Sequence, residues 1–208
     1  MKNADMKEKL LESFRELAKN APIDKITVRQ ISEKCGVTTQ TFYNHFPDKY
    51  ELVHWAYQKR LDRLFKELES GEIDFKTFLR GYLSDYQTNS AFILNAVANT
   101  RGEDSYSTRG GRYFCESIER ETCRVLNVEE LSLEYKLLIK AYVGGFTNLI
   151  LYWLSNGDEI SIDDMVTALA DAVPQKLKDD YVKRNSKSAK IKDSKEFTKN
   201  HRIISTHT

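Results

Sequence analysis

A short stretch, TTQTFYNHF at residues 38–46, gathers side chains that could read the edges of DNA bases. Gln and Asn can each bond adenine N6 and N7 together, and Thr can hydrogen-bond a base or touch a thymine methyl group. Counted from Phe42 at about 100° per residue, Gln40 and Asn44 project from the opposite face. Phe46 lies on the Phe42 side. We therefore expect a short helix that is anchored by its phenylalanines and presents amides outward.

The rims of this helix carry hydrogen-bond donors. Tyr43, His45 and Lys49 suit phosphate oxygens, as does the N-terminus of a helix that begins after Asp48. A lone Gln or Asn would more readily indicate a solvated amphipathic helix. Because consecutive helix caps surround this stretch, we favour a helix that contacts DNA bases over a solvated amphipathic helix.

The first caps enclose a helix before the polar stretch. Thr27 followed by Gln30 is a capping box and predicts a helix that starts at Thr27. Gly36 can adopt the left-handed conformation that closes a helix, so this helix should end at Cys35.

The next caps enclose the polar stretch itself. Thr38 can cap a second helix of about two turns, which ends before Pro47. We also expect the Thr38 side chain to pack on the same side as Phe42. Asp48 with Glu51 repeats the capping box and opens a long helix. Two short helices joined by a glycine turn have the geometry of a helix-turn-helix, whose second helix enters the major groove.

The run ITVRQISEKCGVTTQTFYNHFPDKYELV resembles the DNA-binding signature of the TetR family of bacterial transcriptional regulators, over about residues 5–55. The resemblance implies an all-helical homodimer of about nine helices that binds a double-stranded DNA operator. It also implies the base-reading residues Arg29, Thr39, Gln40, Thr41 and Asn44. The phosphate contacts that we expect are Thr27, Thr38, Tyr43, His45 and Lys49. Position 40, often Gly or Pro in the family, is Gln here and predicts an additional base contact.

The remainder of the chain also predicts helices. Only three prolines and nine glycines interrupt it, and apolar residues recur every three or four positions, which indicates an all-α fold. We expect helices at about 90–99, 108–127, 132–156 and 160–176, and a loop at TRGEDSYSTRGG, residues 100–111. The expected domains are a helix-turn-helix domain at 1–50, a helical regulatory and dimerisation domain at 51–176, and a basic, mobile polar tail at 177–208.

A second, weaker resemblance lies in IKAYVGGFTNLILYWLSNG, residues 139–157. It is similar to the dimerisation helix of a TetR subgroup that includes regulators associated with dihydroxyacetone kinase operons. Some of those work with a protein coregulator. The expected dimer interface is Gly144, Gly145, Phe146, Leu149, Ile150 and Trp153, paired with the helix after Ser161. The alternative is that this apolar stripe is core.

The family resemblance places an effector pocket in the middle of the chain. Aromatic side chains with polar tips suit a mostly apolar pocket. The candidates are Trp55, Tyr82, Tyr86, Phe92, Tyr113, Phe114 and Tyr142, although ordinary core packing is the alternative for each one. The regulator would respond to a small-molecule effector or, alternatively, act as an activator controlled by a protein coregulator.

Composition argues against other classes of protein. Cys35, Cys115 and Cys123 form no CxxC motif and predict neither disulfides nor a metal site. We find no GxSxG, HExxH or phosphate-binding glycine loop, so we expect no enzyme and no cofactor. No signal peptide or membrane span is expected, which points to the cytoplasm. Residues 1–60 carry 11 Lys and Arg against 8 Asp and Glu, whereas residues 61–175 carry 11 against 19. A basic end on an acidic body fits a polyanion at that end.

Overall fold

The structure is a computed structural model that describes residues 2–156 and 159–180. Within these residues the fold is all-α, as predicted. The helices are α1 (Lys2–Ala18), α2 (Val28–Cys35), α3 (Thr39–Tyr43), α4 (Lys49–Ser70), α5 (Phe75–Thr88), α6 (Ser90–Ala98), α7 (Tyr106–Leu126), α8 (Leu133–Ser155) and α9 (Ile162–Asp171). Residues 175–180 form one further helical stretch.

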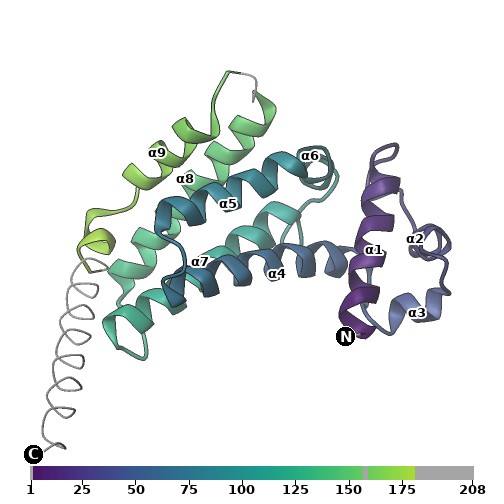
Figure 1. Cartoon of the computed structure of the whole chain (residues 1–208), viewed down its shortest axis with the longest axis horizontal. Helices are drawn as coiled ribbons and strands as arrows, with labels where there is room; N and C mark the ends of the chain where they lie inside the picture. The colour runs from purple at the N-terminus through teal and green to yellow at the C-terminus, as the bar shows by residue number, and fades with distance from the viewer. Residues whose placement is uncertain (1, 157–158, 181–208) are drawn as a thin grey trace, which may run out of the picture.

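Two groups of helices share one long element (Figure 1). Helices α1, α2 and α3 form a small unit at one end, and α5, α7, α8 and α9 form a larger body at the other. The 22-residue α4 starts at the small unit and runs about 33 Å along the body. Helix α6 contacts α1, so the body meets the small unit at two places.

Each group has its own buried apolar contacts. In the small unit, Phe14, Ile31 and Phe42 are fully buried. In the body, the ring of Tyr82 stacks on Phe114 at 5.6 Å. Trp153 of α8 is also buried, and its indole N–H donates to the Ile160 carbonyl at 2.9 Å.

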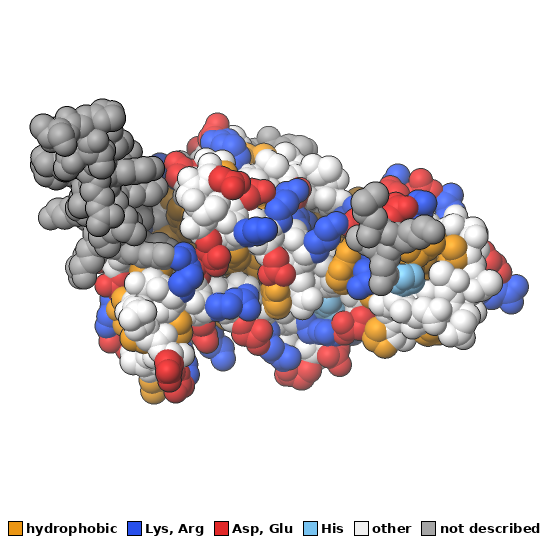
Figure 2. All heavy atoms as spheres, turned by 60° about the horizontal axis from the view of Figure 1, so that its bottom comes forward, with side chains coloured by type: hydrophobic (Ala, Val, Ile, Leu, Met, Phe, Trp, Pro, Cys, Tyr) orange, Lys and Arg blue, Asp and Glu red, His pale blue; other side chains and the backbone are white. Residues whose placement is uncertain are grey.

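The charges of the body are mixed on the face shown in Figure 2. Lysines and arginines alternate there with aspartates and glutamates. Many pair across helices, such as Arg80 with Asp163, which joins α5 to α9. The net negative charge of the body is therefore not gathered into one patch on this face.

Two predicted boundaries are wrong. The loop expected at residues 100–111 ends at Ser105, because the Ser105 hydroxyl accepts the Thr108 N–H and caps α7. Gly110 then sits inside α7, facing the ring of Tyr57. Helix α9 ends at Asp171 rather than at 176.

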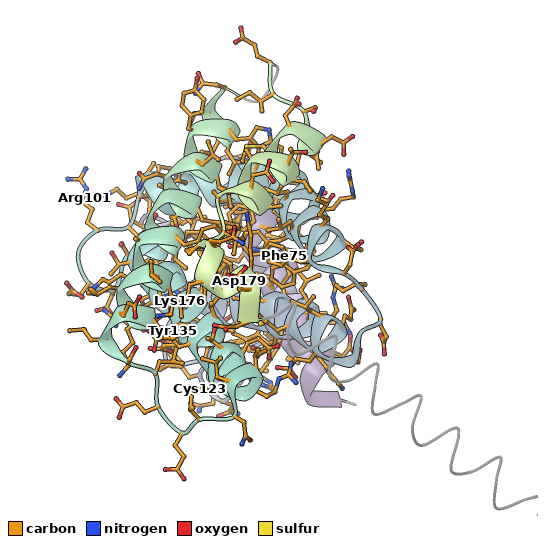
Figure 3. All side chains as sticks on the ribbon, turned by 90° about the vertical axis from the view of Figure 1, so that its left-hand side faces the viewer. Phe75, Arg101, Cys123, Tyr135, Lys176 and Asp179 are labelled. Atoms are coloured by element: carbon orange, nitrogen blue, oxygen red, sulfur yellow. The ribbon has the colours of Figure 1, made fainter. Side chains whose placement is uncertain are left out.

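The first residues of the expected tail are folded. Leu177 is buried, and the Lys176 ammonium lies 4.6 Å from the centre of the Tyr135 ring of α8 (Figure 3). Tyr135 also donates to Asp180 at 2.6 Å, and this hydrogen bond is the main reason that its pKa rises to about 12. The tail from residue 181 onward lies outside the described residues.

Helix α8 has two apolar sides. Among the described helices it is the one long and apolar enough to cross a membrane, which the sequence analysis did not foresee. One side packs into the body and makes α8 a core helix. Phe146, Ile150 and Trp153 lie on that side at 1–2% exposure, so their assignment to the dimer interface is wrong. The spacing of apolar residues identifies an apolar face of a helix, but it does not identify the element that packs against that face.

Candidate nucleic-acid interface

The predicted cap of α2 is confirmed. Thr27 Oγ1 accepts the Gln30 N–H at 3.2 Å, and Gln30 Oε1 accepts the Thr27 N–H at 2.8 Å. Gly36 closes the helix with φ of 72°, a left-handed conformation that favours glycine. These local bonds fix where the chain turns toward α3.

Helix α3 is shorter than the two turns predicted. Thr38 Oγ1 accepts the Thr41 N–H at 3.1 Å and begins the helix, which ends at Tyr43. Thr38 is exposed, so the expectation that it packs beside Phe42 is wrong. Its side chain is used for the cap and for a 3.0 Å contact with the Thr41 hydroxyl.

The outward face of α3 carries the predicted amides. Phe42 and Phe46 are buried at 0% and 4% exposure and hold α3 against the small unit. Thr39, Gln40 and Asn44 are exposed on the other side. The Gln40 Nε2–H donates to Asn44 Oδ1 at 3.1 Å, so the two amides act as one connected surface. Thr41 is half-buried at its edge.

Arg29 lies on α2 rather than on α3. Its guanidinium pairs with Glu33 one turn further along, with Nε–Oε1 at 2.7 Å. Both side chains are largely exposed. An exposed pair of this kind is worth little, so Arg29 can leave it for DNA at small cost.

The proposed phosphate contacts differ in exposure. Tyr43 is 54% exposed and stands at the edge of α3. His45 is half-buried, and its Nδ1 is buried without a hydrogen-bond partner among the described residues. At the buried Nδ1, an acceptor lone pair without a hydrogen bond costs less free energy than an N–H without one. The tautomer with its proton on Nε2 is therefore favoured.

Lys49 has a structural role that the sequence did not show. Its ammonium donates to the Asp24 carbonyl at 2.8 Å and to the Ile26 carbonyl at 2.6 Å. Burial lowers the pKa of this ammonium. Lys49 therefore ties the start of α4 to the segment before α2, with one N–H left over.

The first turns of α4 also bond to the body. Asp48 caps α4 by accepting the N–H groups of Tyr50 and Glu51. The Glu51 carboxylate pairs with Arg109 of α7 instead of completing the predicted capping box. Buried His54 bonds to the backbone of Asp104, just before α7.

Asn95 of α6 makes a second connection that sequence reasoning missed. Its Oδ1 accepts the Ile23 N–H at 3.0 Å, and its Nδ2 donates to the Ala18 and Ala21 carbonyls at 2.8 Å each. The connection between α1 and α2 is thus held by a body residue more than 70 positions away. No local pattern around residue 95 signals this role.

The seven pocket candidates are spread through the chain. Tyr82 and Tyr86 lie together beside a cavity of about 20 Å³, also lined by Tyr57, Tyr106 and Thr147. That volume holds about one water molecule. The other candidates do not line this cavity: Phe114 stacks on Tyr82, Phe92 packs on Phe14, Trp55 packs on Phe46, Tyr113 bonds Asp62, and Tyr142 bonds the Leu169 carbonyl.

These features define a helix-turn-helix DNA-binding protein. The family description "Bacterial regulatory proteins, tetR family" matches residues 10–55, which include α2, α3 and the start of α4. Residues 10–55 of this chain therefore carry the DNA-binding segment of the TetR family of bacterial regulatory proteins.

Solved structures share the fold over about four fifths of the chain. "Dihydroxyacetone kinase operon activator DhaS" aligns with a TM-score of 0.58 at 15% identity, covering 83% of this chain and 96% of that one. A TetR regulator from Streptococcus agalactiae 2603V gives 0.59 at 17%, covering 83% and 95%. Thermus thermophilus FadR, a TetR-family repressor in complex with lauroyl-CoA, gives 0.55 at 14%, covering 80% and 92%. At these identities the likeness establishes the fold. No curated protein matches the sequence.

Proposed function

We propose that this regulator acts in the cytoplasm as a homodimer on an inverted-repeat operator, and that a ligand bound in the body controls its affinity for DNA. The observation that carries the proposal is a pair of surfaces that the described part of the chain leaves exposed, one polar on α3 and one apolar on α8. Two-fold symmetry would present two α3 helices to successive major grooves.

The DNA contacts follow from the exposed faces. Gln40, Asn44 and Thr39 would meet base edges from the major groove. Arg29 and Thr41 would complete the base-reading set from its edges. The phosphate contacts would be Thr27, Thr38, Tyr43, His45 and Lys49, around the rim.

The outward side of α8 would form the dimer contact. Leu137 and Tyr152 are each 57% exposed, although both are large and apolar. Between them, Gly144 and Gly145 have open space where a side chain would stand. Small residues let a second helix approach closely, and burying this apolar side against a second copy would remove it from water. Leu149, which is half-buried, remains among the residues that we propose for the dimer contact.

Helix α4 would transmit the ligand signal. Lys49 ties its first turn to the small unit, while Glu51 and His54 tie the next turn to α7 and its preceding loop. A ligand that favours one position of α4 would change the spacing of the two α3 helices. Such coupling is typically worth about 1–3 kcal/mol.

One observation favours a second candidate, control by a protein coregulator. The cavity beside Tyr82 and Tyr86 has room for only about one water molecule, so an effector would have to open it. One structural neighbour is named as an operon activator and another as a repressor bound to lauroyl-CoA. Thermal-shift screening against metabolites separates the two candidates, because silence across the screen favours the coregulator.

The test of the proposal combines light scattering with selection of a duplex from a random pool. We expect a dimer at micromolar concentration and a selected sequence with two-fold symmetry. Tyr152→Glu should give a monomer that binds DNA weakly. Val128→Glu, at a site 43% exposed in the connection between α7 and α8, is the matched control. A wild-type monomer, with or without DNA, would contradict the dimer.

A further inference from the structure

Three arginines surround one carboxylate where α1, α4 and α5 meet. Asp85 Oδ2 lies 3.6 Å from Arg60 Nε and 3.8 Å from Arg63 Nη2. Both distances exceed that of a hydrogen bond. Arg15 of α1 lies close by: burial lowers the pKa of its guanidinium, and the charge of Arg60 acts in the same direction. The Asp85 carboxylate is thus shared between Arg60 and Arg63 and makes a hydrogen bond to neither of them.

Two of these arginines have buried N–H groups with nothing to bond. Arg60 Nε, Arg60 Nη2 and Arg15 Nε have no hydrogen-bond partner in the part of the chain that the structure describes. The Nε–H and Nη2–H of one guanidinium point in the same direction and form a fork that fits the two oxygens of a carboxylate. Buried donors without partners are rare and costly, so this pair indicates a missing acceptor.

Aromatic rings hold the Arg60 guanidinium in place. It lies 4.8 Å from the centre of the Tyr86 ring and 5.7 Å from those of Tyr57 and Tyr82. The hydroxyls of these tyrosines bond one another, Tyr57 to Tyr82 at 3.1 Å and Tyr82 to Tyr86 at 3.0 Å. The rings therefore fix the guanidinium plane and supply an apolar wall, while their oxygens are already engaged.

We propose that the Arg60 fork binds the carboxylate of a small organic acid, which takes the place that Asp85 occupies beside it. Asp85 can turn to Arg63, which is 62% exposed and already 3.8 Å away. The rings beside Arg60 would contact the organic part. An oxyanion of tetrahedral shape, such as phosphate, fits the vacated place of a planar carboxylate less well.

The position of the site gives it a regulatory consequence. Arg15 belongs to the small unit, whereas Arg60 and Asp85 belong to α4 and α5. An anion that bonds both Arg60 and Arg15 would hold the DNA-binding helices against the body. This consequence rests on the proposed function, whereas binding of the acid does not.

The test uses the full chain and observes the arginine Nε–H signals by NMR during titration with benzoate, at ionic strength matched with sodium chloride. We expect a saturable shift of the Arg60 signal. Asp85→Asn removes the competing carboxylate and should tighten binding about tenfold, as expected for one charged hydrogen-bonded contact. Arg80→Gln, on the far side of α5 at Asp163, is the control and should leave the Kd unchanged.

Substitution at the site itself separates shape from charge. In the Arg60 variants, binding is followed through the Nε–H signal of the neighbouring Arg15. Arg60→Gln should abolish saturable binding. Arg60→Lys keeps the charge but loses the fork, and should remove the preference for benzoate over chloride. Unchanged binding in both variants would overturn the site. The site would also be overturned if neither the wild type nor Asp85→Asn showed a saturable shift up to about 50 mM benzoate. That concentration is well above the millimolar Kd that such contacts support.

Further titrations address the chemistry and the consequence. Phosphate that shifts the Arg60 signal as strongly as benzoate would overturn the choice of a carboxylate. Benzoate that binds but leaves affinity for the selected duplex unchanged would overturn the regulatory consequence and leave the site standing. Failure to select any duplex would count against the proposed function alone, because the NMR titration needs no DNA.

Discussion

At the scale of residues, the bond between Gln40 and Asn44 narrows what the pair can read. Gln40 Nε2 donates to Asn44 Oδ1, which leaves Gln40 Oε1 as an acceptor and Asn44 Nδ2 as a donor. These match the N6 donor and N7 acceptor of adenine. Gln40→Ala should cost about 1–3 kcal/mol on the selected duplex and little on a random one. Titrations on both duplexes measure it, and equal weakening on both would show that Gln40 reads no base.

Lys49 combines a phosphate contact with an internal bond. Lys49→Ala should weaken binding to every duplex and flatten the slope of log affinity against log salt by about 0.9 for each phosphate that a subunit no longer neutralises. It should also lower the melting temperature, because the carbonyls of Asp24 and Ile26 lose a charged donor. Lys25→Ala, at an exposed lysine beside Asp24, is the matched control for stability. Weakening confined to the selected duplex would contradict the phosphate role.

His54 should make folding sensitive to acid. Burial, followed by the charge of Arg109, lowers the pKa of His54 in the folded chain below its ordinary 6.5. The unfolded chain then binds the proton more readily, so this stabilisation is full above pH 6.5 and is lost as the pH falls below it. Between about pH 7.5 and about pH 5.5, the melting temperature should fall less in His54→Gln than in the wild type. Thermal melts measure the two slopes, with His45→Gln as control, and identical slopes would exclude His54.

At the scale of elements, the sequence predicts what is local. Thr27, Gly36 and Thr38 mark helix ends through bonds that span a few residues, and all three are confirmed. The end of the 100–111 loop was missed because Ser105 caps α7 inside a stretch whose glycines suggest a loop.

Contacts between distant segments could not be predicted. The bonds of Lys49 to Asp24 and Ile26 span 23–25 residues, and those of Asn95 to residues 18–23 span 72–77. The two apolar sides of α8 look alike in the sequence. Which of them is core is decided by α5 and α7, which pack against it.

Asn95 tests how α6 supports the small unit. Asn95→Ala removes four hydrogen bonds, one of them from Asn99. It leaves the Ile23 N–H and two carbonyls without these partners, so the free energy of unfolding should fall by about 2–4 kcal/mol. Asn89→Ala loses only a bond to Asp85 on the preceding helix and serves as the control. Urea denaturation measures both variants. A smaller decrease in Asn95→Ala than in Asn89→Ala would show that this residue does not support the unit.

At the scale of the whole molecule, a symmetric dimer should require a fixed distance between half-sites. Recognition helices that lie in successive major grooves are about 34 Å apart, or one turn of DNA. Inserting about 5 bp at the centre of the selected duplex turns one half-site to the opposite face and should abolish tight binding. Fluorescence anisotropy with labelled duplexes checks this, with base substitutions of unchanged length as control. Tight binding to the lengthened duplex would mean that the subunits bind independently.

The positions of the two tryptophans provide built-in optical reporters. Trp55 lies against Phe46 at 5.7 Å, with the ammonium groups of Lys7 and Lys59 near its ring. Trp153 is buried in α8, on a pocket that Gln87 of α5 and Ser90 of α6 also line, and its N–H is bonded to Ile160. In a Trp153→Phe chain, all indole emission would come from the junction of α3 and α4. In a Trp55→Phe chain, it would come from the α8 side. Two spectra could then show whether a change in the body reaches the DNA-binding end, without any added label.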